Sequence, residues 1–377
     1  MDQNKWGYIS GKIQQIYDKK NKKNINYWHY TSIDALINIF KDYRESSEDI
    51  IDSFNLYASH IRFMNDSEEY NNGESKFRSL INTPLLKDYS SVLDCSETNA
   101  YVLSFCEDGD LLSQWKWYGR DSGISFCFNA KDAVYKTYSE IVPEDCKEHI
   151  IFDAFTKPLP VYYTNDDKDK YFEFLLKDIL VKRNPEIKLD ESSLDLLAYL
   201  FIPYCKNESF IEEAEHRLVF FDFNQDSKET LKFNYVYNKG SNGVTKPALN
   251  VNVKHKAILY DSYFSNRKPA SKNKQLISKM FVGPGYNQHL VFNCLIHIFD
   301  RNRYHFQHDL LHIDPQKYKD YGIDDTVYTE NSIPKDKQVH FIEYSKKHNN
   351  ITTTVKTEAY KCSNDLLIIK SAIPFRG

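Results

Sequence analysis

Strand-like and helix-like segments follow one another irregularly in this chain, and that order is the strongest constraint on its fold. Apolar runs typical of buried strands occupy residues 100–106, 124–128, 278–283 and 366–371. Helical segments do not separate each of these runs from the next. A doubly wound parallel sheet requires regular alternation of strands and helices, so the pattern argues against it. We expect an α+β protein with a mixed or antiparallel sheet core and flanking helices.

The remaining elements follow from periodicity. An aromatic strand at residues 25–30 runs into an amphipathic helix, with Thr31 and Ser32 available to cap it. Further segments are predicted as follows: strands at 54–63, 159–163, 213–223 and 256–261, and helices at 110–118, 172–180, 194–202 and 289–299. Pro203 should end the third of those helices. With no repeat and no Gly/Ser-rich linker, we predict a single domain over residues 1–377, with a polar surface insertion near 300–360.

Composition narrows the function classes. The formal net charge is -4, so nothing draws the whole chain toward nucleic acids or anionic membranes. The seven cysteines are widely spaced without a Cys-x-x-Cys pair, which argues against disulfides and a cysteine zinc site. No apolar signal core opens the chain, and the longest apolar run, Leu194–Cys205, contains Asp195 and is too short to span a bilayer. We expect a cytoplasmic protein.

The most informative polar segment is Glu213-Ala214-Glu215-His216-Arg217. On a strand, alternation would place Glu213, Glu215 and Arg217 on one face. One interpretation is a catalytic pair of carboxylates acting at an anomeric carbon, where one stabilises an oxocarbenium-like transition state and the other orients the nucleophile. The other interpretation is a structural ion pair at the end of a strand. Spacing alone favours the structural ion pair, because such pairs are common.

Two aromatic segments could contact a ligand. His29, within Trp28–Ser32, could donate a hydrogen bond to a sugar hydroxyl, with help from the hydroxyl of Thr31. In Gln114–Tyr118, the rings of Trp115 and Tyr118 could stack on a base or a nicotinamide. A packed strand with a helix cap is the stronger interpretation of Trp28–Ser32, whereas core packing and ligand binding explain Gln114–Tyr118 equally well.

Two further segments raise the question of a metal. Asn65–Glu69 is rich in oxygen ligands but lacks the spacing of an EF-hand loop, which favours a solvated turn. His305, His308 and His312 could share one helical face, but no cysteine or clear third carboxylate accompanies them. We therefore predict no metal site. Gly-x-Gly-x-x-Gly, Walker A and Gly-x-Ser-x-Gly motifs are absent from the sequence, so any nucleotide must be held by side chains and strand edges.

In order, several short motifs resemble the bacterial family known as domain of unknown function 2971, across residues 27–377. They are Trp28-His29-Tyr30-Thr31-Ser32; Met64–Glu69; Ser104–Glu107 with Trp115, Tyr118 and Gly123; Lys206 with Phe210, Glu213, Glu215 and Arg217; Gly283-Pro284; and Ser371–Arg376.

More loosely, the chain resembles the three-part pattern of ADP-ribosyltransferases. The matching parts are the His-Tyr-Thr strand, a central aromatic residue and the late Glu-x-Glu. The resemblance implies that His29, Tyr30 and Thr31 contact the ribose of NAD and that Trp115 or Tyr118 stacks on nicotinamide. It also implies that Glu215 stabilises the oxocarbenium ion and that Glu213 assists the acceptor. We assign Arg217, on the same predicted face, to the binding of NAD. The chain departs from the pattern where Ser104-Phe105-Cys106 replaces the usual Ser-Thr-Ser strand.

Three hypotheses result. The first is an NAD-consuming mono-ADP-ribosyltransferase or NAD glycohydrolase, with NAD as its small-molecule substrate, a protein or nucleic acid as acceptor, and a role as a bacterial toxin-like or anti-phage defence effector. The second is a nucleic-acid or nucleotide binding protein without catalysis. The third is a metal-dependent nuclease that uses Asp66, Glu68, Glu213 and Glu215.

Overall fold

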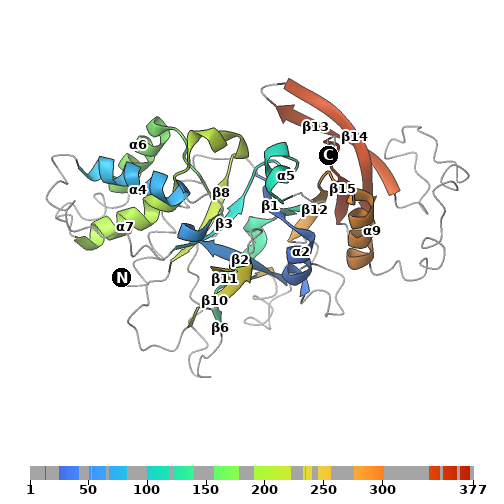
Figure 1. Ribbon diagram of the computed structural model, residues 1–377, viewed down its shortest axis with the longest axis horizontal. Helices are drawn as coiled ribbons and strands as arrows, with labels where there is room; N and C mark the ends of the chain where they lie inside the picture. The colour runs from blue at the N-terminus through green and yellow to red at the C-terminus, as the bar shows by residue number, and fades with distance from the viewer. Residues whose placement is uncertain are drawn as a thin grey trace, which may run out of the picture. The chain divides into compact units, whose positions relative to one another are not determined.

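The computed structural model divides the chain into two compact units (Figure 1). It describes residues 13, 25–41, 51, 53–64, 68–82, 100–118, 123–139, 157–177, 191–221, 232–233, 235–239, 245–255, 276–300, 339–348, 351–362 and 366–373. Unit 1 comprises Met1–Tyr27, Ser53–Glu107 and Ala130–Lys272. Unit 2 comprises Trp28–Asp52, Asp108–Asn129 and Asn273–Gly377. Whether the chain is one folding domain stays a prediction.

Unit 1 contains a seven-stranded sheet in the order β10-β11-β2-β3-β8-β7, with β5 paired to β11. All its described strand pairs are antiparallel. Its strands are β2 (Ser53–His60), β3 (Ala100–Phe105), β5 (Ala133–Lys136), β7 (Leu159–Pro160), β8 (His216–Phe221), β10 (Tyr235–Lys239) and β11 (Thr245–His255), and a separate ribbon joins β6 (Tyr138–Ser139) to β9 (Lys232–Phe233). Inward residues of β2 alternate with half-buried ones, as expected for a sheet covered on one face.

Three helices of unit 1 pack together beside β3 and β8 (Figure 1). They are α4 (Glu68–Ile81), α6 (Asn165–Phe174) and α7 (Glu191–Phe201). Short 3₁₀ helices precede α4 and β5 and lead from α7 to β8; they are η1 (Ile61–Phe63), η4 (Ala130–Asp132), η7 (Ile202–Tyr204) and η8 (Glu208–Glu213). Leucines at 194, 197 and 200 of α7 are fully buried. Pro203 lies in η7, directly after α7, so the predicted end of this helix is confirmed.

Unit 2 is built on a six-stranded mixed sheet in the order β1-β4-β12-β15-β14-β13. The strands are β1 (Tyr27–Thr31, whose first residue belongs to unit 1), β4 (Ile124–Phe128), β12 (Ile277–Val282), β13 (Val339–His348), β14 (Ile351–Lys361) and β15 (Leu367–Lys370). The β12–β15 pair is parallel, and the pairs of β12 with β4 and of β14 with β13 and β15 are antiparallel. Helix α9 (Gln288–Phe299) packs on β15 and β12, and α2 (Ile33–Ile39) and α5 (Leu112–Tyr118) complete the unit.

The predicted α+β class, with mixed and antiparallel sheets and flanking helices, is confirmed. The polar insertion predicted near 300–360 falls largely on residues 301–338, outside the described residues, and its far end forms the β13–β14 hairpin. The strand predicted at 256–261 also lies outside them. Helix α6 begins earlier than the predicted 172–180 segment, because Thr164 caps it through a hydrogen bond from the backbone N–H of Asp167.

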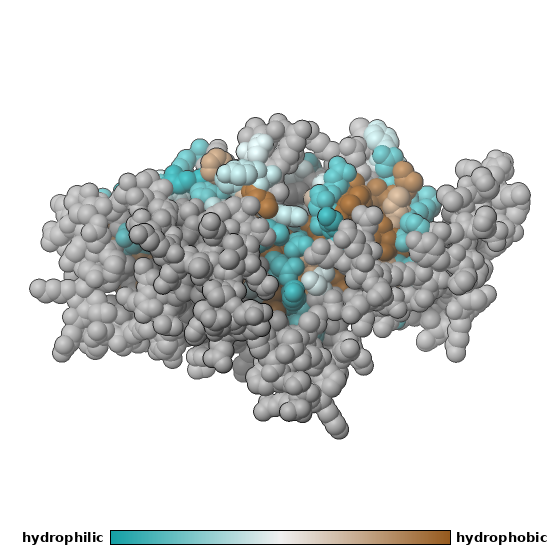
Figure 2. All heavy atoms as spheres, turned by 90° about the horizontal axis from the view of Figure 1, so that it is seen from below, coloured by the Kyte–Doolittle hydropathy of each residue, from teal (hydrophilic) through white to brown (hydrophobic). Residues whose placement is uncertain are grey.

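Within the described part of the chain, we find no helix that is both long enough and apolar enough to cross a membrane. On the face drawn in Figure 2, hydrophilic and hydrophobic side chains of the described residues are intermixed.

Candidate functional site

The segment that leads into β8 is a capped 3₁₀ helix followed by a sharp turn. Asn207 caps η8 by accepting a hydrogen bond from the backbone N–H of Ser209 at 3.0 Å. The helix ends at Glu213, and Ala214 then adopts a left-handed conformation, with φ 42° and ψ 51°. A non-glycine residue in this region is strained, so the surrounding contacts must hold it there. The turn directs Glu215 into the start of β8.

This geometry corrects the prediction of a strand over residues 213–223. Strand β8 begins at His216, and Glu213 is the last residue of a 3₁₀ helix. Strand alternation therefore does not align Glu213 with Glu215 and Arg217. The three side chains still converge, because they share basic and acidic partners from other segments.

The centre of this group is the ammonium of Lys206. Its Nζ lies 2.6 Å from Glu213 Oε2, 3.0 Å from Glu215 Oε2 and 3.1 Å from Glu69 Oε1. All four side chains are less than a tenth exposed. One lysine thus joins carboxylates from α4, from η8 and from the residue directly before β8.

Arg217 completes the group, which we call the carboxylate cluster (Glu69, Lys206, Glu213, Glu215 and Arg217). Its side chain is fully buried and pairs in a bidentate manner with Glu215, at 2.7 Å from Nε to Oε1 and 2.9 Å from Nη2 to Oε2. Nη2 also donates to Glu69 Oε2 at 2.6 Å, and Nη1 donates to the carbonyl of Pro203 at 2.7 Å. Buried charges are tolerated only when they are paired in this way.

Three carboxylates and two cations give the cluster a formal charge of -1 when all are ionised. Burial alone would raise the pKa of Glu215, but the charges of Arg217 and Lys206 and the hydrogen bond from Arg217 outweigh it and lower that pKa to about 2. Burial raises the pKa of Glu213, and Lys206 offsets this only in part. The surroundings therefore raise the pKa of Glu213 and lower the pKa of Glu215.

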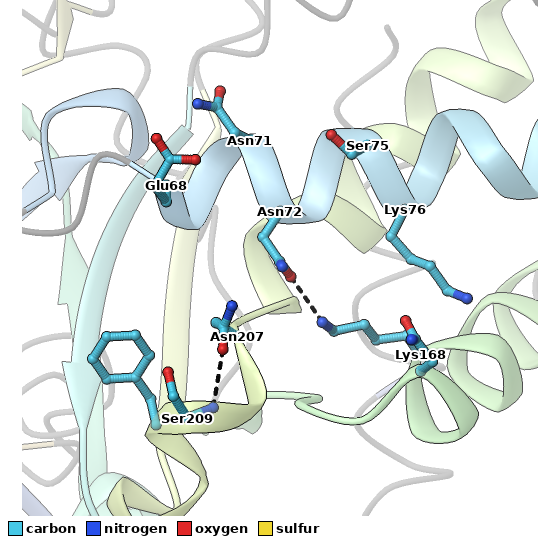
Figure 3. A pocket seen from close by; sticks show the side chains of 10 residues that line it. Glu68, Asn71, Asn72, Ser75, Lys76, Lys168, Asn207 and Ser209 are labelled. Carbon is cyan, nitrogen blue, oxygen red and sulfur yellow. Dashed lines mark hydrogen bonds between the residues drawn. The ribbon is translucent and has the colours of Figure 1, made fainter.

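A polar pocket of about 650 Å³ opens beside the cluster (Figure 3). It is lined by α4, the first turn of α6, the middle of α6 and the start of η8, through Glu68, Asn71, Asn72, Ser75, Lys76, Asn165, Lys168, Asn207, Ser209 and Phe210. Lys168 Nζ donates to Asn72 Oδ1 at 2.8 Å. The ring of Phe210, which lines the pocket, lies 4.8 Å from the Lys206 ammonium, so the pocket borders the cluster.

Five of the six predicted NAD-binding residues lie in unit 2, namely His29, Tyr30, Thr31, Trp115 and Tyr118, whereas the sixth, Arg217, lies in unit 1. Tyr30 is buried; its hydroxyl donates to the carbonyl of Asp108 at 2.9 Å and accepts from the N–H of Leu111 at 2.8 Å. Thr31 is also buried, and the half-buried His29 ring lies 5.3 Å from that of Phe126. These contacts fit the packing interpretation, and a role toward ribose stays a prediction.

Trp115 is buried at 3% exposure, and its indole Nε1 donates to Asp110 Oδ1 at 2.8 Å. Its ring lies 4.8 Å from that of Tyr30, and a Cβ added to Gly283 would meet it at 2.6 Å. Tyr118 ends α5, and its side chain is not among those described. Stacking on nicotinamide by either ring stays a prediction. Glu213, Glu215 and Arg217 lie in unit 1, and the structure brings these three side chains together there.

The candidate metal ligands of the sequence lie partly outside the described residues. Asn65, Asp66 and Ser67, and His305, His308 and His312, lie outside the described residues. Among those that are described, no three His, Cys, Asp or Glu side chains are arranged to hold a metal ion. Glu213 and Glu215 face ammonium and guanidinium groups, and Glu68 lines the pocket.

Reasoning from the sequence missed the roles of Glu69 and Lys206. Glu69 was grouped with a solvated turn, yet it is buried in the first turn of α4 and contacts Arg217. The i, i+4, i+8 spacing of Glu69, Gly73 and Phe77 is the signal that places Glu69 on the buried face of this helix. Lys206 appeared only as part of a family-like motif.

One comparison with known proteins gives a match. Residues 114–218 match the model of a family described as a protein of unknown function, DUF2971. The matched segment contains Trp115, Lys206 and the acidic turn through Arg217. The expected resemblance over residues 27–377 is thus supported within this segment. No curated protein and no solved structure matches the chain, and similarity to ADP-ribosyltransferases has no support from these comparisons.

Proposed function

We propose that this protein cleaves the bond between nicotinamide and ribose in NAD, as an NAD glycohydrolase or a mono-ADP-ribosyltransferase. The observation that carries the proposal is the pair Glu213 and Glu215. Both contact one lysine, yet the pKa of one is raised and that of the other lowered. Carboxylates whose environments separate their pKa values are typical of enzymes that act on glycosidic bonds.

Each carboxylate would have a distinct role. Glu215 stays ionised because Arg217 and Lys206 hold its charge, so its field favours the positive charge that develops on the ribose. Glu213 uses only Oε2 in its contact with Lys206, and its raised pKa suits it to accept a proton. As the C1′–N bond breaks, its electron pair neutralises the nicotinamide ring. Water or an acceptor hydroxyl then bonds to C1′ and gives its proton to Glu213.

The other parts of the hypothesis are carried by resemblance alone. His29, Tyr30 and Thr31 would contact ribose, and Trp115 or Tyr118 would contact nicotinamide. An ADP-ribosyltransferase-like fold and a role as a bacterial toxin or anti-phage effector belong to the same proposal. The match to DUF2971 over residues 114–218 covers the acidic turn but names no activity.

Nicotinamide release from NAD tests the proposal. The purified protein should release nicotinamide, and Glu213→Gln should lower the rate by about 100-fold or more, as loss of a general base does. Glu212→Gln is the matched control, because Glu212 is exposed on the same turn and makes no contact with Lys206 among the described residues. If the protein releases no nicotinamide, with or without protein and nucleic-acid acceptors, the proposal is wrong. Equal rates for the two variants would remove Glu213 from the mechanism.

The second candidate is a nucleotide or nucleic-acid binding protein without catalysis. It is favoured by the polar pocket, whose amides, hydroxyls and two lysines suit a sugar-phosphate ligand. NAD would then bind to wild-type protein and to Glu213→Gln alike, and neither would release nicotinamide. For a nucleic acid, affinity would also fall steeply with salt.

A further inference from the structure

The pocket of unit 1 contains a buried lysine, Lys168, that contacts no carboxylate among the residues the structure describes. The Lys168 side chain is 3% exposed, and among the described residues its ammonium has one side-chain contact, the amide oxygen of Asn72. Lys206, which is buried to a similar degree, contacts three carboxylates. Leaving a buried cation without a counter-ion is costly. Carboxylates offset this cost for Lys206, whereas Lys168 has only a neutral amide oxygen among its described contacts.

A second cation lies at the same end of the pocket. Lys76 also lines it and pairs with Asp169 at 2.6 Å, through a carboxylate that is 46% exposed. Burial lowers the pKa of Lys168 and the charge of Lys76 lowers it further, and Cys205 and Glu208 offset these effects only in part. Both effects would be relieved by an anion bound between the two ammonium groups.

The rest of the lining is neutral and rich in hydrogen-bonding groups. Four amides and two hydroxyls come from Asn71, Asn72, Asn165, Asn207, Ser75 and Ser209. Such groups suit the hydroxyls and oxygens of a sugar phosphate. The single carboxylate of the lining, Glu68, lies at the start of α4, and Lys76 lies in the middle of this helix (Figure 3), about 12 Å away at the usual helical rise.

The pocket therefore has an acidic end and a basic end. Its acidic end is next to Glu69 and so to the carboxylate cluster, and its basic end holds Lys76 and Lys168. A ligand with phosphates at the basic end would extend its sugar toward the cluster.

We propose that Lys168, with Lys76 beside it, binds the phosphate groups of an ADP-ribosyl ligand in this pocket. The identity of the ligand rests on the proposed function, and the phosphate chemistry rests on the pocket. Lys168 is a binding residue in this scheme and takes no part in bond cleavage.

Isothermal titration calorimetry of the full chain with ADP-ribose, inorganic pyrophosphate and adenosine tests the proposal. ADP-ribose and pyrophosphate should bind, and adenosine, which has no phosphate, should bind at least about tenfold more weakly than ADP-ribose, as expected when charge-assisted contacts are lost. Lys168→Gln should weaken ADP-ribose binding by about tenfold or more. Lys170→Gln is the matched control, because this lysine lies in the same helix but is exposed and paired with Asp166.

A second variant guards against loss of folding in Lys168→Gln. Asn72→Asp would supply a carboxylate within reach of Lys168 and add a negative charge to the pocket, so the fold should persist while ADP-ribose affinity falls. Pyrophosphate that binds as tightly as ADP-ribose would still support a phosphate site but would remove the sugar from recognition. Unchanged affinity in Asn72→Asp, or equal affinities in Lys168→Gln and Lys170→Gln, would overturn the proposal.

The outcome is separable from that of the proposed function. Glu213→Gln should keep the ADP-ribose affinity of the wild type while it loses nicotinamide release. Binding that depends on Lys168 without any nicotinamide release would leave the phosphate site standing and refute the proposed function. If the protein releases nicotinamide and Lys168→Gln does not alter the KM for NAD, the proposed function is supported and the phosphate site is refuted.

Discussion

The guanidinium of Arg217 touches three segments of unit 1: Glu69 of α4, Pro203 of η7 and Glu215 before β8. Each contact is buried, so water cannot replace it. A residue with so many buried polar partners affects stability mainly through what its removal leaves unpaired.

Arg217→Gln should therefore lower the free energy of unfolding by about 3–5 kcal/mol, because two buried carboxylates lose their main counter-ion. Urea denaturation followed by circular dichroism measures this. Arg78→Gln is the control: Arg78 pairs with Glu74 on the more exposed face of α4, and its loss should cost no more than about 1 kcal/mol. Similar losses in the two variants would show that the cluster contributes little to stability.

The pKa of Glu215 predicts a dependence of stability on pH. Its folded pKa of about 2 lies below the ordinary 4.5, so the unfolded chain binds the proton more tightly. Its contribution to stability is complete above pH 4.5 and is lost as the pH falls toward 2. Glu213 has the opposite sign: its raised pKa means that stability decreases as pH rises from 4.5 through the folded pKa.

Urea unfolding at a series of pH values separates these contributions. The decrease in stability below pH 4.5 should be shallower in Glu215→Gln than in the wild type. Glu213→Gln should keep the wild-type decrease below that pH and lose the opposite trend above it. An unchanged acid slope in Glu215→Gln would show that its pKa is not depressed.

At the scale of elements, α4 has two functions, since it contributes Glu69 to the cluster and half of the pocket lining. It can lie close to η7 because residue 73 is glycine. A Cβ at this position would meet the carbonyl oxygen of Ile202 at 2.6 Å. That oxygen belongs to the backbone, so it cannot move aside as a flexible side chain would.

Gly73→Ala should therefore destabilise the protein, although the same change in an open helix stabilises it by about 1 kcal/mol. The thermal unfolding temperature should fall, and α4 should shift enough to weaken ligand binding in the pocket. Ser79→Ala, at an exposed position of the same helix, should change stability by about 0.5 kcal/mol or less. A Gly73→Ala protein as stable as the wild type would indicate that α4 and η7 are not packed so closely.

Much of the element pattern could be predicted from the sequence. The strands 100–106, 124–128, 278–283 and 366–371 and the helices 33–40, 194–202 and 289–299 match the structure to within a few residues. Each is a run with clear apolar periodicity or continuous burial, which a local pattern can reveal. β13 and β14 were missed because polar residues such as Thr352, Thr353 and Thr354 dominate them and give no apolar alternation.

The candidate site was only partly predictable, for two physical reasons. The turn at Ala214 needs a left-handed backbone that alanine rarely adopts, so no residue type marked the end of η8. The partners of the acidic residues are distant in sequence: Arg217 meets Glu69, 148 positions away. Charge pairing over such distances depends on the assembled sheet and helices, which the local sequence does not encode.

At the scale of the whole molecule, positive and negative charges nearly balance, but they are concentrated at different places. The net charge is only -4, yet unit 1 holds a buried acidic cluster and, a few turns along α4, a basic pocket end. Affinity for an anionic ligand would therefore be local, and salt should weaken it less than it weakens binding to an exposed basic surface.

The sheet of unit 2 also has a consequence for the order of events during protein synthesis. Strand β15 lies between β12 and β14, and residues 367–370 are translated after every other strand of that sheet. Until they leave the ribosome, β12 lacks its parallel neighbour, and the β13–β14 hairpin has no strand through which to join the sheet. The nascent chain thus exposes two open strand edges, which are the features that chaperones shield and that aggregation exploits.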